Sequence, residues 1–490
     1  MRRSTPWIAL VGCLGLGACA ASHTAWEDAA PPLEPLLGEH YTAADPEAAE
    51  PVDLEGQPAL EWWKRYEDAE LDLLIAEVLT GNLDLATAAA RVREAEAVLG
   101  TASAARGPSV DAALRAARTF QRLDSIGTNL GRIYDSSLRA GLTVSWQADL
   151  FGRLRATERA RLASLLATEH DRLALAHTLV ASVVRLRAAI SVADRRLALA
   201  SEIIESRGST LSIVERRYRS GLDTASAVDV HLSRENLAAA EAALPPLELA
   251  KAQSEHALDE LLGRKPDAGD GDSRQLAALP ALAPPPLGLP ASLLDRRPDL
   301  AAAELRATAA AAEVDVALAA RYPDLTLTAA SGWDGNQFGE LFDDETLFGN
   351  FVAQLAAPIF TSGRLKSEVA AARARLEASA SDYAARVLAA LREVEDAWIA
   401  ERRLREQLAG VERQLAEARL AEGLARTRYE RGLENLLVVL DTERRRAAAE
   451  DLALRLEQSV WNARTDLHLA LGGDWFAPAV TDLDAEAPRP

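Results

Sequence analysis

The chain carries an internal duplication, and this repeat limits its possible folds more than any other feature. Residues 106–109 resemble residues 321–324, and residues 217–222 (Arg-Tyr-Arg-Ser-Gly-Leu) resemble residues 428–433 (Arg-Tyr-Glu-Arg-Gly-Leu) at almost the same separation. Matches that recur in the same order at a nearly constant separation indicate a tandem repeat of one structural unit. Each half of the chain should therefore contain the same elements in the same order.

Two long stretches without proline predict very long helices. No proline lies between residues 152 and 244 or between residues 359 and 477, and Ala, Leu, Arg and Glu dominate both stretches. Their apolar residues recur at alternating spacings of four and three, which is typical of packed helices. Gly221 and Gly432 are expected to end the long helices, and Pro245 and Pro246 to kink a short one. We predict long helices over 152–219 and 363–430, and shorter helices over 68–104, 225–262, 296–320 and 436–471.

Each repeat also contains one predicted β-hairpin. Apolar residues alternate with polar or small ones over 109–146 and again over 324–359, which is the pattern of strands with one apolar face. We predict strands of about ten residues, long enough to cross a bilayer when tilted, joined by solvated loops at about 120–136 and 334–349. A half-buried soluble sheet is the alternative. Four aromatic residues near the strand ends fit membrane-interface girdles: Trp146, Trp333, Phe348 and Phe351.

The number of strands has a consequence for assembly. Four strands cannot close a barrel, because a packed interior needs about eight. In lipid, the open edges of a sheet would leave backbone groups without hydrogen bonds. If these strands span a membrane, several chains must therefore contribute to one barrel. No uninterrupted run of about 18 apolar residues is present, so we expect no membrane-spanning helix.

The N-terminus has the pattern of an export signal that ends at a cysteine. Two arginines precede an apolar stretch over residues 7–16, and the run Leu-Gly-Ala-Cys ends at Cys19. This run resembles the lipobox of bacterial lipoproteins, in which the cysteine takes up lipid, and Ala20 after it resembles the signal for sorting to the outer membrane. An ordinary cleavage site is the alternative. Because Cys13 would leave with the leader, the mature chain would hold Cys19 alone and no internal disulfide.

Charge and motif content argue against nucleic-acid binding and against catalysis. Acidic residues outnumber Lys and Arg by 74 to 54, and no basic run is interleaved with aromatic residues. His170 and His177 share a helical face without a neighbouring zinc motif, so we expect them at the surface. The acidic residues from Asp267 to Asp272 lack the glutamate spacing of a calcium loop. We therefore expect no enzyme activity and no cofactor apart from the lipid on Cys19.

Several segments, taken in order, resemble the outer-membrane factor family of TolC-like channels, specifically its lipoprotein branch that serves resistance-nodulation-division efflux pumps. The resemblance covers nearly all of the mature chain. It implies a mainly helical fold with a small β part, in which long helical hairpins form an α-barrel tunnel and two β-hairpins contribute to a trimeric, 12-stranded transmembrane β-barrel. The most specific matches are residues 145–154 (Ser-Trp-Gln-Ala-Asp-Leu-Phe-Gly-Arg-Leu), 294–300 (Leu-Asp-Arg-Arg-Pro-Asp-Leu), 357–365 and 393–397.

The resemblance also implies functional residues at the far end of the helices. Gly221, Leu222, Gly432 and Leu433 match the periplasmic tips that meet the adaptor (membrane fusion) protein of the pump.

Leu437 and Asp441 match the closed end of the tunnel, as an apolar plug ring and an acidic ring. Three carboxylates around one narrow lumen repel each other and attract cations, so Asp441 would bias gating and selectivity. Leu436 stands where many relatives have an aromatic residue. Whether Asp229 of the first repeat also faces the tunnel stays open.

The sequence thus predicts a homotrimeric outer-membrane channel, lipid-anchored and extending into the periplasm, that exports drugs or small solutes from an inner-membrane pump. A type I protein-secretion channel and a non-conducting coiled-coil scaffold are the alternatives. Neither the substrate nor the pump can be derived from the sequence. The expected organisation is a signal peptide (1–18), a lipidated extended segment (19–60), a first repeat (61–263, with its hairpin at 109–146 and long helical hairpin at 152–262), a linker (264–290), a second repeat (291–473, with its hairpin at 324–359 and long helical hairpin at 363–471) and a C-terminal tail (474–490).

Overall fold

The computed structural model describes residues 25–31, 62–125, 128–220, 226–266 and 296–473. The expected leader, Cys19, all of the segment 19–60 except residues 25–31, most of the linker and the C-terminal tail lie outside the described residues, as do Gly221 and Leu222. The chain forms two compact units, and each draws on both sequence repeats. Unit 1 comprises 1–31, 94–165 and 305–381, and unit 2 comprises 32–93, 166–304 and 382–490.

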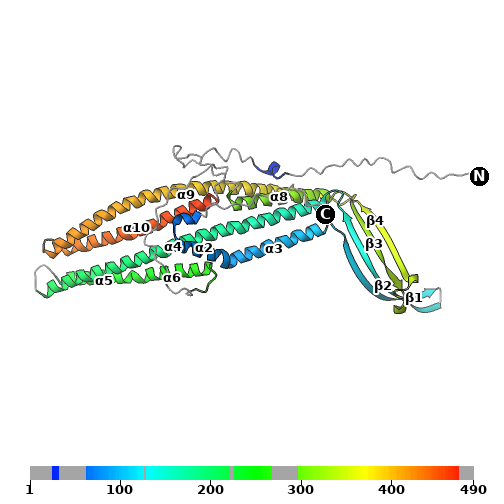
Figure 1. Cartoon of the computed structure of the whole chain (residues 1–490), viewed down its shortest axis with the longest axis horizontal. Helices are drawn as coiled ribbons and strands as arrows, with labels where there is room; N and C mark the ends of the chain where they lie inside the picture. The colour runs from blue at the N-terminus through cyan, green and yellow to red at the C-terminus, as the bar shows by residue number, and fades with distance from the viewer. Residues whose placement is uncertain (1–24, 32–61, 126–127, 221–225, 267–295, 474–490) are drawn as a thin grey trace, which may run out of the picture. The chain divides into compact units, whose positions relative to one another are not determined.

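The helices follow the expected order, and the two long ones match almost to the residue. Both are 67 residues long and end next to the expected glycine turns. Within unit 2, α4 runs alongside α5 and α6, and α9 alongside α10 (Figure 1). The helices are α2 (Ala69–Gly81), α3 (Leu83–Ala104), α4 (Arg153–Arg219), α5 (Ala227–Ala242), α6 (Leu244–Leu261), α8 (Pro298–Ala319), α9 (Arg364–Glu430) and α10 (Leu436–Ala470).

Two of the expected short helices are each divided in two. Asn82 separates α2 from α3: its side-chain oxygen accepts from the backbone N–H of Leu85 at 2.9 Å, and its amide donates to the carbonyl of Leu261 at 2.8 Å. The expected kink at Pro245 and Pro246 is instead a new start, because α6 begins one residue before them. The first turn of a helix tolerates proline since its N–H groups have no helical partner there.

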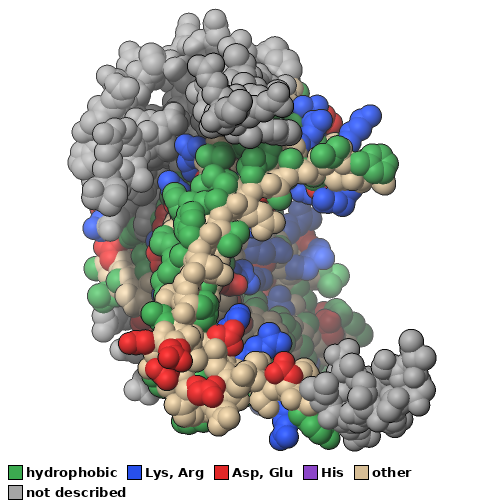
Figure 2. Space-filling model, turned by 90° about the vertical axis from the view of Figure 1, so that its right-hand side faces the viewer, with side chains coloured by type: hydrophobic (Ala, Val, Ile, Leu, Met, Phe, Trp, Pro, Cys, Tyr) green, Lys and Arg blue, Asp and Glu red, His purple; other side chains and the backbone are tan. Residues whose placement is uncertain are grey.

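The four strands form one antiparallel sheet in the order β1-β2-β3-β4. The first hairpin is longer than expected, because β1 and β2 continue through most of the region predicted as a loop at 120–136. The second is closer to expectation, although its last strand ends at Ala356 and two short 3-10 turns lie in its loop. Acidic side chains gather around this loop (red, bottom of Figure 2). The strands are β1 (Ser109–Ser125), β2 (Thr128–Ala148), β3 (Asp324–Gly335) and β4 (Leu347–Ala356).

One face of the sheet is apolar and uncovered by the described chain. The side chains on this face include Val110, Leu114, Leu142, Phe351 and Leu355, each more than half exposed. The sheet therefore needs an apolar environment on that side.

The girdle prediction is wrong for one aromatic residue. Phe348 pairs directly with Gly332, whereas Phe351 pairs with Ala329, so the two aromatic side chains lie on opposite faces of the sheet. Trp146 and Trp333 share the apolar face with Phe351. Alternation in the sequence showed two faces, but the aromatic residues were assigned by their closeness to strand ends and not by register.

Unit 2 has an aromatic core where the first 3-10 segment after residue 61, η2 (Trp62–Tyr66), packs on α2, α4 and α10. Trp62 stacks on His468 with ring centroids 5.0 Å apart, and Tyr66 lies 4.6 Å from Trp461. Burial raises the pKa of Tyr66 to about 12, and its hydroxyl hydrogen-bonds to Thr465 at 3.3 Å. These contacts tie the first described residues of unit 2 to its last helix.

The expectation of no membrane-spanning helix was too strict. The helix α4 contains an apolar window with a mean hydropathy of 1.5 that is long enough to cross a bilayer. The helices α2 and α3 together are also long and apolar enough, although they are bent relative to each other. In α4, 56% of that window is buried inside the chain, as in the core helix of a soluble protein. The window in α4 contains scattered polar residues, so it is not an uninterrupted run of apolar residues and was not expected from the sequence.

A buried ion pair joins α9 to α10. The guanidinium of Arg464 is 2% exposed and donates to both carboxylate oxygens of Glu401, with the Nε–Oε2 distance at 2.8 Å. Arg405 donates to the same carboxylate at 2.8 Å. Removing one member of a buried pair leaves a charge with poor solvation, which typically costs about 3–5 kcal/mol.

Glu401→Gln should therefore lower the thermal unfolding midpoint strongly, because Arg464 would lose its counter-charge inside the protein. Glu406→Gln is the matched control: Glu406 lies five residues further along α9 and pairs with Arg403, but both side chains are more than half exposed. Its substitution should cost about 1 kcal/mol or less. Circular-dichroism melts of the two variants should differ clearly, and equal midpoints would refute a stabilising role for the buried pair.

Candidate aperture site

The described residues that the sequence assigned to the tip and the aperture lie in the turn between α9 and α10 and in the first two turns of α10. Gly432 has φ +76°, a conformation that favours glycine. Its N–H donates to the carbonyl of Tyr429 at 2.9 Å, and the N–H of Leu433 donates to that of Arg428 at 2.9 Å. This pair of bonds is the Schellman motif, which satisfies carbonyls at a helix C-terminus. The glycine turn is therefore a defined helix stop, and Leu433 beside it is 64% exposed.

The first turn of α10 separates buried from exposed leucines. Asn435 caps the helix, because its side-chain oxygen accepts from the N–H of Leu437 at 3.0 Å. Leu436 is buried among Val214, Tyr429 and other residues at the ends of α4, α5 and α9, whereas Leu437 is 55% exposed. Leu436 therefore holds the tip together. The exposed side chain of Leu437 is available for contact with another copy of the chain, as its assignment to a plug ring requires.

Asp441 has counter-charges in its own helix, which the sequence analysis did not consider. Its carboxylate accepts from Arg444 at 2.7 Å and from Arg445 at 2.6 Å. The hydrogen bonds from Arg444 and then Arg445 hold the pKa of Asp441 below its usual range. The spacings of three and four residues were visible in the sequence and are those at which helical side chains meet. The group at this position is thus one carboxylate with two guanidiniums, and not an isolated acid.

Asp229 serves as a helix cap. Its carboxylate accepts from the backbone N–H of Ser226 at 2.8 Å, and the Ser226 hydroxyl accepts in return from the N–H of Asp229. This reciprocal arrangement is a capping box. These hydrogen bonds give Asp229 a local role at the start of α5.

An arginine that the sequence analysis did not single out ties the ends of the two long helices together. Arg217 of α4 donates to the carbonyls of Tyr429 and Glu430 at 2.7 and 3.0 Å, and its guanidinium lies 4.4 Å from the ring centroid of Tyr429. Both residues belong to the repeated Arg-Tyr segments. The duplication was a usable signal, although only the fold shows that the arginine of one copy meets the tyrosine of the other.

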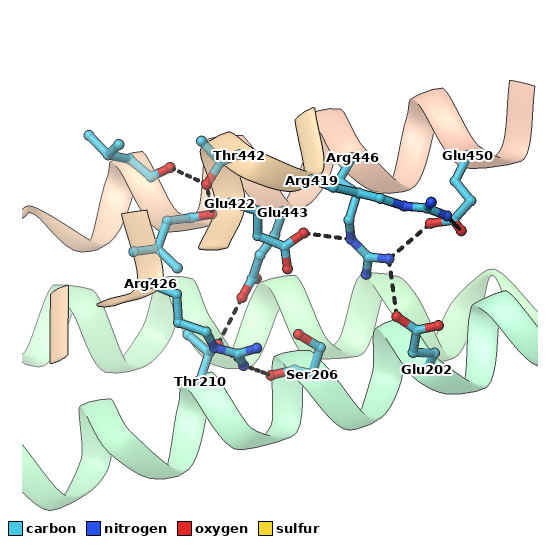
Figure 3. A network of polar contacts seen from close by, with 12 residues as sticks. Glu202, Ser206, Thr210, Arg419, Glu422, Arg426, Thr442, Glu443, Arg446 and Glu450 are labelled. Carbon is cyan, nitrogen blue, oxygen red and sulfur yellow. Dashed lines mark hydrogen bonds and ion pairs between the residues drawn. The ribbon is translucent and has the colours of Figure 1, made fainter. Parts of the chain in front are cut away.

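Behind the tip, a charged network lies between α4, α9 and α10 (Figure 3). Arg446 is its centre: this side chain is 10% exposed and lies 2.5 Å from Glu422, 2.9 Å from Glu450 and 3.1 Å from Glu202. Arg426 donates to the carbonyl of Ser206 at 3.3 Å. Since buried charges are costly when separated, the network favours one alignment of the α9–α10 hairpin on α4.

Glu443 is a buried carboxylate of this network with a raised pKa. It is 5% exposed, and one carboxylate oxygen accepts from Thr210 at 2.9 Å. Burial raises the pKa of Glu443, against the lowering effects of Thr210, Arg426 and Arg207, while Glu422 adds to the rise. The protonated form is thus favoured in the folded protein relative to the unfolded chain.

The sign of the resulting pH dependence follows from linkage. A raised pKa in the folded state means that stability increases as pH falls through that value and levels off below the unfolded value of about 4.5. Each unit of pKa difference is worth about 1.4 kcal/mol. Glu443→Gln should therefore raise the unfolding midpoint at about pH 8 and remove this part of the pH dependence in thermal melts. Glu412→Gln, at an exposed position of α9, should leave the slope intact, and an unchanged slope in Glu443→Gln would contradict the assignment.

The two histidines expected at the surface are buried. His170 is 6% and His177 3% exposed, and burial lowers the pKa of His177 to about 4. Helical periodicity placed both on one face, but the covering helices come from distant parts of the sequence. No group of three or more His, Cys, Asp or Glu side chains suited to a metal ion occurs among the described residues.

Long paired helices with a glycine-turn tip, and a sheet whose apolar face no described residue covers, are the features that the sequence predicted for a channel-forming protein of the outer membrane. The family model for outer membrane efflux proteins matches residues 74–264 and 289–473. The chain belongs to this family.

Individual relatives agree with this assignment. The pyoverdine export outer membrane protein OpmQ of Pseudomonas putida is 35% identical over 432 residues, which cover 86% of this chain and 90% of OpmQ. The outer membrane protein OprJ of Pseudomonas aeruginosa is 32% identical over 472 residues, 95% of each chain. Among solved structures, the outer-membrane channel OprN matches with a TM-score of 0.81 and 28% identity over 89% of this chain and 96% of that one. The chain is an efflux protein of the outer membrane, and these relatives are channel and efflux proteins rather than enzymes.

Proposed function

We propose that this protein is the passive outer-membrane conduit of a tripartite efflux system. Three copies would join their four-stranded sheets into one 12-stranded barrel, and their helices would continue the lumen into the periplasm. The observation that carries the proposal is the sheet itself, which, among the described residues, exposes an apolar face and leaves β1 and β4 each with one unpaired edge. Pairing β4 of one copy with β1 of the next satisfies both edges and places the apolar face against lipid.

The pump partners follow from the same proposal. The sequence has no nucleotide-binding fingerprint, so a separate inner-membrane pump must supply the energy, and we expect one of the resistance-nodulation-division type. The exposed tip at Gly432 and Leu433, with its counterpart at Gly221 and Leu222, would meet the periplasmic adaptor protein. The solutes are drugs or other small molecules, and the protein itself performs no chemical step.

The alternatives differ in testable ways. A coiled-coil scaffold would not need an uncovered apolar sheet face, so the structure favours a conduit. A type I protein-secretion channel would share the sheet and the helices and would differ in its inner-membrane partner. Conductance separates a scaffold from a conduit, and identification of the co-purifying pump separates the two conduits.

Purified trimer in a planar lipid bilayer should show discrete channel currents, and Asp441→Ala should raise the leak conductance. Without Asp441, Arg444 and Arg445 lose their shared carboxylate, and like charges at the tip then repel one another across the narrow lumen. Asp396→Ala is the matched control, since Asp396 is an exposed acid of α9 that also pairs with an arginine four residues away. Its current should equal that of the wild type.

Two results would count against this proposal. A folded trimer that never conducts, even with Asp441→Ala, would remove the conduit function. A conducting trimer whose leak is the same in both variants would remove Asp441 from the aperture.

We also propose that Cys19 carries the lipid anchor. Support comes from Trp26 and Ala29, which pack against Ala311, Val314 and Leu376 of α8 and α9 in unit 1. Trp26 lies seven positions after Cys19, a reach of about 25 Å at most, so the lipid would insert close to this docking point. One acyl chain binds membranes only weakly, and the strands would provide the second membrane contact.

Cys19→Ser should abolish incorporation of radiolabelled palmitate, because no other cysteine remains in the mature chain. Cys13→Ser should label like the wild type, since Cys13 leaves with the leader. Persistent labelling of Cys19→Ser would refute the anchor.

A further inference from the structure

The polar face of the sheet contains one aromatic residue in the part of the ladder that the structure describes with side chains. On β3 and β4 this face is formed by Thr326, Thr328, Ala330, Gly332 and Asp334, and by Phe348, Asn350, Val352 and Gln354. In the proposed barrel it is the face that lines the lumen. Its aromatic ring distinguishes Phe348 from the mostly small and polar side chains around it.

Two glycines let strands β2 and β3 approach closely beside this ring. Gly332 is the direct partner of Phe348 on β4 and of Gly141 on β2 (strands in Figure 1), so the three residues form one row across the sheet. A Cβ on Gly332 would lie 2.1 Å from the carbonyl oxygen of Ala140. A Cβ on Gly141 would lie 2.9 Å from the carbonyl oxygen of Ser331 and 3.5 Å from Cζ of Phe348. The ring thus extends along the row towards β2 and does not stand free.

Charged neighbours hold the ring from the next row. The guanidinium of Arg139 lies 4.9 Å from the ring centroid of Phe348, a distance typical of a cation–π contact. The Nε of Arg139 donates to Asp334 at 3.1 Å, and Arg115 is the direct partner of Arg139 on β1. All these residues share the polar face, so the ring is fixed by an ion pair on one side and by glycine backbone beneath it.

We propose that Phe348, positioned by Arg139, faces the barrel lumen and contacts exported solutes through its ring. Three copies would place three such rings around the lumen, near the end of the sheet that carries the hairpin loops. Solutes with planar aromatic or apolar surfaces are those that would stack on such a group. This inference rests on the proposed conduit, because the polar face lines a lumen only in the closed barrel.

Cysteine labelling tests whether the polar face of the sheet, with position 348 on it, lines the lumen. Phe348→Cys and the control Phe351→Cys are prepared in a Cys13→Ser, Cys19→Ser, Asp441→Ala background, so that the introduced cysteine is the sole thiol and the tip is expected to be open. A membrane-impermeant, water-soluble maleimide is added to reconstituted trimer during single-channel recording. Phe348→Cys should react, and the current should fall in up to three steps as each copy is modified. Phe351→Cys, on the same strand but on the lipid face, should neither react nor change the current.

A second variant tests whether Arg139 positions the ring, and its thermal unfolding midpoint shows whether the protein still folds. Arg139→Gln keeps Phe348 but removes the charge over its ring, so the open-state current should become noisier or larger while the thermal unfolding midpoint of the trimer stays close to the wild-type value. Reaction of Phe351→Cys instead of Phe348→Cys, or modification of Phe348→Cys with no change in current, would overturn the inference. If no variant conducts but the labelling pattern holds, the conduit function fails and the assignment of the two faces stands.

Discussion

Unpaired backbone groups at the two edges of the sheet are the constraint from which the rest of the architecture follows. Among the described residues, four antiparallel strands leave one edge of β1 and one edge of β4 without partners, and one face of the sheet is apolar and uncovered. In lipid, each unpaired N–H or C=O costs several kcal/mol. The proposed trimer would pair these edges between copies. The sheet itself comes from the tandem duplication, because each repeat adds one hairpin.

The helical part is held by a mixture of small apolar residues and buried charges. Alanines and valines at the helix contacts let helices approach closely, as at Ala380, Val387 and Val394, but they contribute little directional preference. The ion pair of Arg464 with Glu401 and the network around Arg446 add that preference, because each works in only one alignment of the helices. Cohesion and alignment thus come from different residue types on the same helix faces.

Sequence reasoning succeeded where neighbouring residues set the structure and failed where contacts with distant parts of the chain set it. The limits of α4 and α9 were predictable because glycines follow both helices and proline is absent from their interiors. The breaks at Asn82 and before Pro245 were not, since Asn82 is held by the carbonyl of Leu261 and the prolines are accommodated by a new helix start. The burial of His170 and His177 was missed for the same reason: periodicity identifies a face but not what covers it.

The sequence by itself determined the repeat, the two long helices, the two hairpins and the candidate residues of the tip, because each of these is written in spacing or in turn chemistry along the chain. Only the tertiary structure decided the surroundings of those residues. It joined Arg217 of one repeat to Tyr429 of the other, buried His170 and His177, and placed Phe348 on the polar face beside Gly332. The physical reason is that local patterns set backbone conformation and facing, whereas charge compensation and strand register depend on groups that folding brings together.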